Sequence, residues 1–464
     1  MGFLRNSISL LFLGVLHAQE YGAYIPPMCY TNPKQEGRIT NPCYPCHIDG
    51  KAPNFYNETA LQLQYAFPKA MMQNPYTNLF VDRGASITTI EDATMRDYIR
   101  TSNYTSSLRD TYGCYFEFDS EGFDHDAQGN YTLWRAFVYA PFMGTFFPTN
   151  GAMDDVMIRL PKIFAQNSQG ILDVEIYKAN FEALIDNILS RHPAPTPYVG
   201  AAHAIKADFG LYPVGTQFLH TVRYIDEVNG TLVPSARLKE LRWGRKERHV
   251  DYAALEQLSH REIFEELDEE NLPYLRAYRG SGEAGFDNGM GWIYGGYIED
   301  AKGALRVQND AETRACMGCH SLLGATTDST FALPRIVRWG YQTLKGIADV
   351  QGEYAAYLRA NPSGNEYGDN DEVRAKFFTP EGQERPEAFA KLQKSIDTLL
   401  LPSAKRAMML NKAYWLIVKE QSFAQGRDAS IAPARNVHRE IKSLDTGITA
   451  PIVAPTPPFM YYKR

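Results

Sequence analysis

The sequence has 464 residues, of which 44% are hydrophobic and 22% are charged, and its formal net charge is −7. This length is enough for the cores of two or three domains, and the composition is ordinary for a globular protein. The longest basic cluster, residues 242–249, is short, and we interpret it as a solvated strand end. Nucleic acid is therefore not expected as a partner, because phosphate binding needs a concentrated basic surface.

Residues 1–18 have the features of a secretory signal peptide. Arg5 supplies a positive charge, an apolar stretch covers residues 8–16, and Ala18 offers a small residue at the cut. The apolar stretch is too short to span a bilayer, and we find no other stretch that is long enough. We therefore predict an exported periplasmic protein without a stable membrane span.

After the signal peptide we divide the chain into three regions, 19–190, 198–335 and 336–464. The first begins with loops and short helices and ends in residues 171–190, whose apolar periodicity indicates an amphipathic helix. The central region contains a predicted helix at 251–268. The third region is mainly helical and ends in a proline-rich tail.

The clearest strand pattern lies at 211–245, where Asn229-Gly230 is typical of a hairpin turn. Helical patterns dominate afterwards, as in residues 386–421, which are broken at Pro402. The predicted fold class is therefore mainly α, with irregular loops, a small β hairpin or sheet element, and haem sites like those of c-type cytochromes.

Two segments have the pattern Cys-x-x-Cys-His, namely Cys43, Cys46 and His47, and Cys316, Cys319 and His320. The pattern matches the attachment site of c-type haem. Residues at i, i+3 and i+4 lie on one side of a helical turn. The two thiols can then bind the porphyrin while the imidazole reaches the iron. We therefore predict two covalently bound haem c groups, with His47 and His320 as proximal iron ligands.

Other cysteine chemistries fit less well. Zinc ribbons place two Cys-x-x-Cys pairs about 15–20 residues apart, whereas these pairs are far apart and each is followed by His. A thioredoxin-type pair follows a strand and opens a helix, a pattern that residues 39–42 do not show before Cys43. Cys29 and Cys114 are left over, and a disulfide between them suits an oxidising compartment. The sequence leaves that bridge open, because it does not give the distance between them.

The ligand on the other side of each iron decides between electron transfer and catalysis. His220 is the main candidate, because it lies on the apolar face of a predicted strand and a buried imidazole needs a partner. A structural hydrogen bond is its alternative role. His203 and His438 are further candidates. A methionine would raise the potential, and the candidates are Met71, Met72 and Met290.

Five segments resemble a family of exported proteobacterial proteins with c-type cytochrome domains and two widely spaced haem motifs. These segments are 41–47, 77–83, 148–161, 211–224 and 315–335. The resemblance covers most of the chain and implies a dihaem protein of the periplasm. It implies no substrate, because the family has no established reaction.

Two functions are compatible with these features. The favoured one is electron transfer between redox partner proteins through two six-coordinate haems, since the sequence shows no recognisable catalytic constellation. The alternative is a dihaem oxidoreductase, peroxidase-like or acting on a small oxyanion, in which one haem keeps an open site. The length of the chain favours the alternative.

Overall fold

The structure is a computed structural model, and the residues that it describes have gaps between them. They are residues 25, 27–31, 34–35, 38–39, 67, 71–139, 151–266, 279–318, 320, 326–331, 333, 336–339, 342–343, 355, 358–359, 371–394, 397–435 and 437–442. The predicted signal peptide and the whole first cysteine motif lie outside them, as does Cys319 of the second motif.

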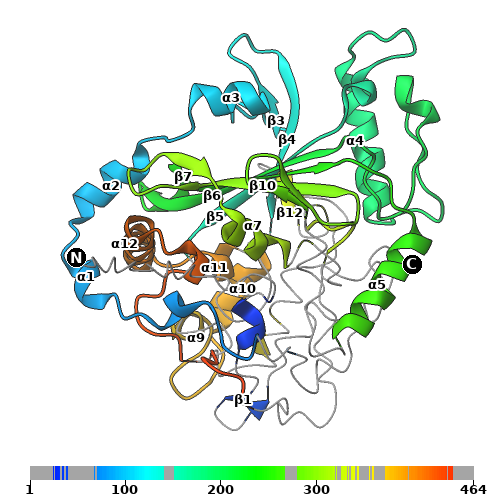
Figure 1. Ribbon diagram of the computed structural model, residues 1–464. Helices are drawn as coiled ribbons and strands as arrows, with labels where there is room; N and C mark the ends of the chain where they lie inside the picture. The colour runs from blue at the N-terminus through cyan, green and yellow to red at the C-terminus, as the bar shows by residue number, and fades with distance from the viewer. Residues whose placement is uncertain are drawn as a thin grey trace, which may run out of the picture.

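An eleven-stranded antiparallel sheet forms the centre of the described structure (Figure 1). Nine strands follow the order β13-β12-β4-β5-β6-β7-β10-β9-β8, while β3 pairs with β4 and β11 pairs with β10. The longer strands are β4 (Tyr131–Tyr139), β5 (Met153–Arg159), β6 (Gln217–Val228), β7 (Thr231–Lys246) and β10 (Trp292–Glu299). The shorter ones are β3 (Phe123–His125), β8 (Arg279–Ser281), β9 (Gly285–Asp287), β11 (Leu305–Val307), β12 (Ile336–Trp339) and β13 (Gln342–Thr343). A separate two-stranded sheet joins β1 (Lys34–Gln35) and β2 (Arg38–Ile39).

The described α-helices surround this sheet. They are α1 (Gly84–Thr88), α2 (Asp92–Arg100), α3 (Ser106–Tyr112), α4 (Val174–Ile188), α5 (Tyr252–Glu266), α7 (Asp310–Met317), α9 (Asp371–Phe377), α10 (Pro386–Lys394), α11 (Asp397–Leu400) and α12 (Ala404–Glu420). Short 3-10 segments are η1 (Pro27–Tyr30), η4 (Thr77–Phe80), η5 (Lys162–Ala165), η6 (Gly200–Ala204) and η9 (Phe423–Gln425). Side-chain caps explain two starts: Asp173 accepts from the first turn of α4, and Ser403, just after Pro402, accepts from the first turn of α12.

The prediction of a mainly α fold with cytochrome-like sites is wrong, because strands between residues 123 and 343 form one large sheet. Strand β10 has buried residues on both of its faces, so its sequence lacks the alternation of apolar and polar residues that reveals a half-exposed strand. Gly295 and Gly296 further weaken its strand signal. The predicted hairpin is present as β6 and β7. Asn229 and Gly230 both have positive φ, 51° and 80°, as its turn requires.

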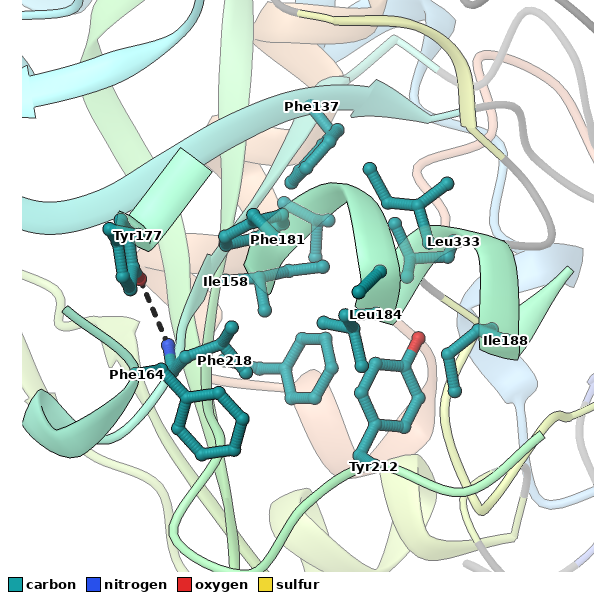
Figure 2. Packing of buried hydrophobic residues seen from close by; sticks show 14 of the residues in the cluster. Phe137, Ile158, Phe164, Tyr177, Phe181, Leu184, Ile188, Tyr212, Phe218 and Leu333 are labelled. Atoms are coloured by element: carbon teal, nitrogen blue, oxygen red, sulfur yellow. Dashed lines mark hydrogen bonds between the residues drawn. The ribbon is translucent and has the colours of Figure 1, made fainter. Parts of the chain in front are cut away.

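Several apolar clusters pack on the sheet, and α4 and α12, which belong to two of them, lie toward opposite ends of it (Figure 1). The first cluster joins Phe181 and Leu184 of α4 to Ile158 and Phe218 of the strands (Figure 2). In the same cluster the hydroxyl of Tyr177 accepts from the backbone N–H of Leu160 at 3.1 Å (Figure 2). The second cluster joins sheet residues to helices α2 and α12, through Tyr224, Ile298, Met95, Ile99, Tyr414 and Ile417.

Strand register places polar residues between these clusters. His220 of β6 pairs with Arg242 of β7, and the next residue on the same face of β6, Val222, pairs with Asp154 and Glu240. Residues directly opposite in antiparallel strands share a face of the sheet. We call Asp154, His220, Glu240 and Arg242 the polar belt. It lies between Phe218 of the first cluster and Tyr224 of the second along the same strand.

Residues 78–79 are hydrogen-bonded to residues 422–434, although these segments lie far apart in the sequence. The side-chain amide of Asn78 donates to the carbonyls of Ser422 and Gly426, at 2.9 and 2.7 Å. Backbone hydrogen bonds continue this pairing, since the N–H of Ala434 donates to Leu79. We call this set of contacts the terminal clasp.

Candidate functional site: the second cysteine motif and the polar belt

The second cysteine motif begins on α7. This helix starts with a capping box in which Asn309 and Glu312 each accept a hydrogen bond from the backbone of the other. Cys316 lies in its last turn, and the backbone N–H of His320 donates to the carbonyl of Cys316 at 3.2 Å. This hydrogen bond connects His320 to Cys316 beyond the end of α7.

The imidazole of His320 is oriented by one hydrogen bond and two aromatic rings. Its Nδ1 lies 2.9 Å from the carbonyl oxygen of Ser329, and because a carbonyl only accepts, Nδ1 carries the proton. The rings of Tyr294 and Phe331 lie 4.7 and 5.0 Å from the imidazole, centroid to centroid. Burial lowers the pKa of His320 to about 4, and the charge on Arg242 acts in the same direction. The imidazole is therefore neutral near pH 7, with the lone pair on Nε2.

The Ser329 carbonyl belongs to a constrained loop. Asp328 and Ser329 have φ values of 49° and 63°, in the left-handed region that residues other than glycine seldom adopt. Asp328 binds the Nζ of Lys246 at 2.6 Å and accepts from the backbone N–H of Tyr212 at 2.8 Å. The Ser329 carbonyl also accepts from the hydroxyl of Tyr294 at 2.6 Å. Such strain persists only where surrounding contacts impose it, and here they fix the acceptor that orients the imidazole.

Two arginines meet beside the cysteine. Arg427, which follows η9, places Nη1 3.1 Å from the Sγ of Cys316 and 3.4 Å from Oε2 of Glu240. Arg242 donates from Nε to the same oxygen at 2.8 Å, and the amide of Gln308 donates to it at 3.1 Å. The polar belt therefore continues directly to the cysteine motif.

The charges of this region act strongly on one another. Burial raises the pKa of Glu240, but Arg242 and Arg427 outweigh it and lower that pKa to about 2. Burial dominates for Asp428 and raises its pKa to about 6, and burial lowers the pKa of Lys239 to about 8. The site thus combines fixed charges with groups that exchange protons near neutral pH.

His220 lies in the polar belt. It is partly exposed, and its Nε2 lies 3.4 Å from Oδ2 of Asp154. The other oxygen of Asp154 is buried and has no hydrogen-bond partner among the described residues. His220 also contributes to the lowered pKa of His320, so both histidines face the same region. The structure brings the predicted distal and proximal candidates to one site, and iron ligation by His220 stays a prediction.

The other predicted ligands lie elsewhere or have other contacts. His203 is exposed on η6, with Nδ1 2.9 Å from the carbonyl of Gly200. The sulfur of Met290 accepts from the hydroxyl of Ser329 at 3.5 Å. Iron ligation by either residue stays a prediction.

A separate group of candidates surrounds Tyr30. The hydroxyl of Tyr30 donates to the carbonyl of Met71 at 3.0 Å, and the backbone N–H of His438 donates to the carbonyl of Tyr30 at 2.6 Å. Met72 and Cys29 pack in the same cluster. Cys114 is instead buried beside Trp134 on the large sheet, so the Cys29–Cys114 disulfide is not formed.

Our interpretation of residues 242–249 as a solvated strand end missed part of the site. Arg242 and Lys246 lie on one face of β7, and Lys246 is only 1% exposed. Their spacing of four residues within a strand, with Gly244 between them, is the signal that could have shown a shared inward face. Arg427 offers no local signal, because only the folded chain brings it to Cys316 across 111 positions.

The described residues contain no group of three or more His, Cys, Asp or Glu side chains that could hold a metal ion. Haem is a different case, because the porphyrin itself binds the iron. Among the helices that the structure places, none is long and apolar enough to cross a membrane.

Comparisons with known proteins find similarity to proteins that are described as lipoproteins. The model of a family described as a type of lipoprotein matches residues 117–345, which include the whole eleven-stranded sheet and the second cysteine motif. A similar protein is an uncharacterised lipoprotein of Aquifex aeolicus, which is 28% identical over 529 aligned positions that cover 91% of this chain and 89% of the relative. No solved structure matches the chain.

These findings correct our family assignment. The resemblance to exported proteobacterial dihaem c-type cytochromes is wrong, because the matching family and the relative are both described as lipoproteins. Assignment to a cytochrome c family is wrong with it, since neither description names a cytochrome family. Lipoproteins are exported proteins with a signal peptide, so the comparisons agree with the predicted export.

Proposed function

We propose that Cys316, Cys319 and His320 attach a haem covalently and that the protein transfers electrons between redox partner proteins. The observation that supports this most is the hydrogen bond from His320 Nδ1 to the Ser329 carbonyl. A histidine that ligates a metal through one ring nitrogen commonly donates its other N–H to a carbonyl or carboxylate, which fixes the ring and its tautomer. His320 has this arrangement, with Nε2 as the remaining donor atom.

The surroundings of the motif also fit such a group. Tyr294 and Phe331 provide an apolar wall beside the imidazole, and Arg242 and Arg427 provide positive charge beside Cys316. The bound haem would supply one-electron chemistry, whereas the protein positions the imidazole and keeps it neutral. The contacts of the constrained loop serve this positioning.

The same proposal extends to Cys43, Cys46 and His47, which repeat the pattern and give two haems per chain. The proposed compartment is the periplasm. The description of the relatives as lipoproteins supports action at a membrane surface of that compartment.

A second candidate is a dihaem oxidoreductase that acts on a small oxyanion or on peroxide. The observation that favours it is the presence of Asp428 and Lys239, whose pKa values of about 6 and 8 allow proton exchange close to the motif. Electron transfer remains our main proposal, because the sequence shows no recognisable catalytic constellation.

Acid-acetone extraction followed by mass measurement tests haem attachment. The full-length exported protein should retain the mass of two haems, and the double variant Cys316→Ser/Cys319→Ser should retain one. His203→Ala, at an exposed histidine, is the matched control for His320→Ala: only the latter should change the spin state of one haem. Two low-spin haems in the unaltered protein would support electron transfer, and one high-spin haem would support the oxidoreductase. Retention of no haem would contradict both.

A further inference from the structure

We infer that Arg242 and Arg427 form a binding site for a carboxylate or a small oxyanion beside Cys316. The ligand has two possible sources with the same chemistry, namely a propionate of the attached haem or a free oxyanion such as nitrite. The first source rests on the proposed function, and the second does not require it.

The geometry supports this inference because two guanidinium groups converge on a single oxygen. Arg242 reaches it from β7 and Arg427 from the segment after η9, and both approach Oε2 of Glu240, at 2.8 and 3.4 Å. A guanidinium is a planar fork of N–H donors that matches carboxylates and other oxyanions. Two such forks offer more donors than one oxygen can accept. Arg427 Nε is buried and donates to no residue that the structure describes.

The balance of charge points the same way. Glu240 stays ionised but carries one negative charge against two arginines. The nearby carboxylate of Glu312 is already bound by Arg306, at 2.7 and 2.8 Å. Among the remaining acids, Asp154 lies against His220, and Asp428 interacts with both arginines. Burial raises the pKa of Asp428 to about 6, so the negative charge on this side decreases below that pH. A ligand with negative charge would complete the site.

The position of the site connects it to the cysteine motif. Arg427 Nη1 contacts the Sγ of Cys316, so a group attached to this thiol lies within the electrostatic reach of both arginines. Arg427 Nη2 is also bound to the carbonyl of Glu312 on α7, which fixes the side chain against that helix. The arginines are therefore held in place before a ligand arrives.

Three substitutions test the site in the full-length exported protein. Arg427→Gln removes one fork, Glu240→Gln removes the competing carboxylate, and Arg245→Gln is the matched control. Arg245 lies on the same strand, but its side chain is 46% exposed and pairs with Glu247. The measurements are retained haem mass, the midpoint potential of each haem, and calorimetric titration with sodium nitrite and with sodium acetate.

The outcomes separate the two sources. If the ligand is a propionate, Arg427→Gln should lower the potential of one haem relative to Arg245→Gln, because loss of a positive charge favours ferric iron, and titration should show no saturable heat. If the ligand is a free oxyanion, the unaltered protein should bind nitrite or acetate saturably. Arg427→Gln should then weaken binding at least tenfold, and Glu240→Gln should strengthen it. Equal potentials in the two arginine variants together with no saturable binding would overturn the inference. A protein that retains no haem would contradict the proposed function, while the titration would still decide the anion site.

Discussion

Lys246 and Asp328 form an ion pair in which neither side chain has exposed area, with Nζ 2.6 Å from Oδ1. Lys246 ends β7, whereas Asp328 lies 82 positions later, in the loop whose Ser329 carbonyl orients His320. The ion pair therefore ties this loop to the sheet. Burial raises the pKa of Asp328 and Lys246 opposes that rise, so the carboxylate depends on its partner.

Breaking this pair should be costly. We expect Lys246→Met to lower the free energy of unfolding by about 3–5 kcal/mol, because it leaves the Asp328 carboxylate buried without a cation. The double variant Lys246→Met/Asp328→Leu should lose less, since no charge is left unpaired. Urea unfolding followed by circular dichroism measures both. If the double variant is as unstable as the single one, the loss of stability comes from altered packing and not from an unpaired charge.

The backbone strain at Ser329 can be measured separately. Ser329→Gly should be more stable than Ser329→Ala by about 1 kcal/mol, because glycine adopts a φ of 63° without steric cost. Both variants lose the same hydroxyl and keep the carbonyl that binds His320, so their difference isolates the backbone term. Thermal unfolding of the two proteins gives the comparison, and equal midpoints would mean that the loop carries no strain.

Gly244 leaves space for a ring that contacts the site. A Cβ at this position would lie 2.7 Å from the ring of Tyr294, which packs on His320. Gly244→Ala should therefore lower the free energy of unfolding by about 1–3 kcal/mol through overpacking. In a Tyr294→Leu background, which lacks the ring, Gly244→Ala should lower the free energy of unfolding by less than it does in the unaltered protein. Urea unfolding checks this, and a neutral Gly244→Ala would mean that the ring moves freely.

Glu240 should make the free energy of unfolding fall as the pH is lowered below about 4.5. Its pKa is lowered from 4.5 to about 2 in the folded protein, where Arg242 and Arg427 outweigh burial. Between pH 4.5 and 2 the unfolded chain then binds more protons at this residue, so its contribution is present above pH 4.5 and is lost as the pH falls. The loss should be on the order of 3 kcal/mol across this window. Unfolding free energies measured against pH should fall less steeply for Glu240→Gln, and parallel curves would contradict the prediction.

Local patterns predicted what depends on local chemistry. Asn229-Gly230 marked the central hairpin, and apolar periodicity marked α4, because turns and amphipathic helices are encoded within a few residues. The extent of the sheet was missed, because β10 is buried on both faces and contains two adjacent glycines. Within the candidate site, the cysteine motif predicted Cys316 and His320. Arg427 and the contacts of the Ser329 loop could not be predicted, because they depend on contacts between distant parts of the chain. Short motifs likewise led to the wrong family, since they do not show what surrounds them.

The terminal clasp has a consequence for the order of folding. Asn78 and Ser422 are 344 positions apart, so a chain that emerges N-terminus first leaves Asn78 without its C-terminal partners until almost all of the chain has emerged. Contacts across such long loops form late and slowly. Arg427 belongs to this late segment, next to Gly426, which Asn78 binds. The contact between Arg427 and the Cys316 thiol therefore forms among the last, together with the rest of the clasp.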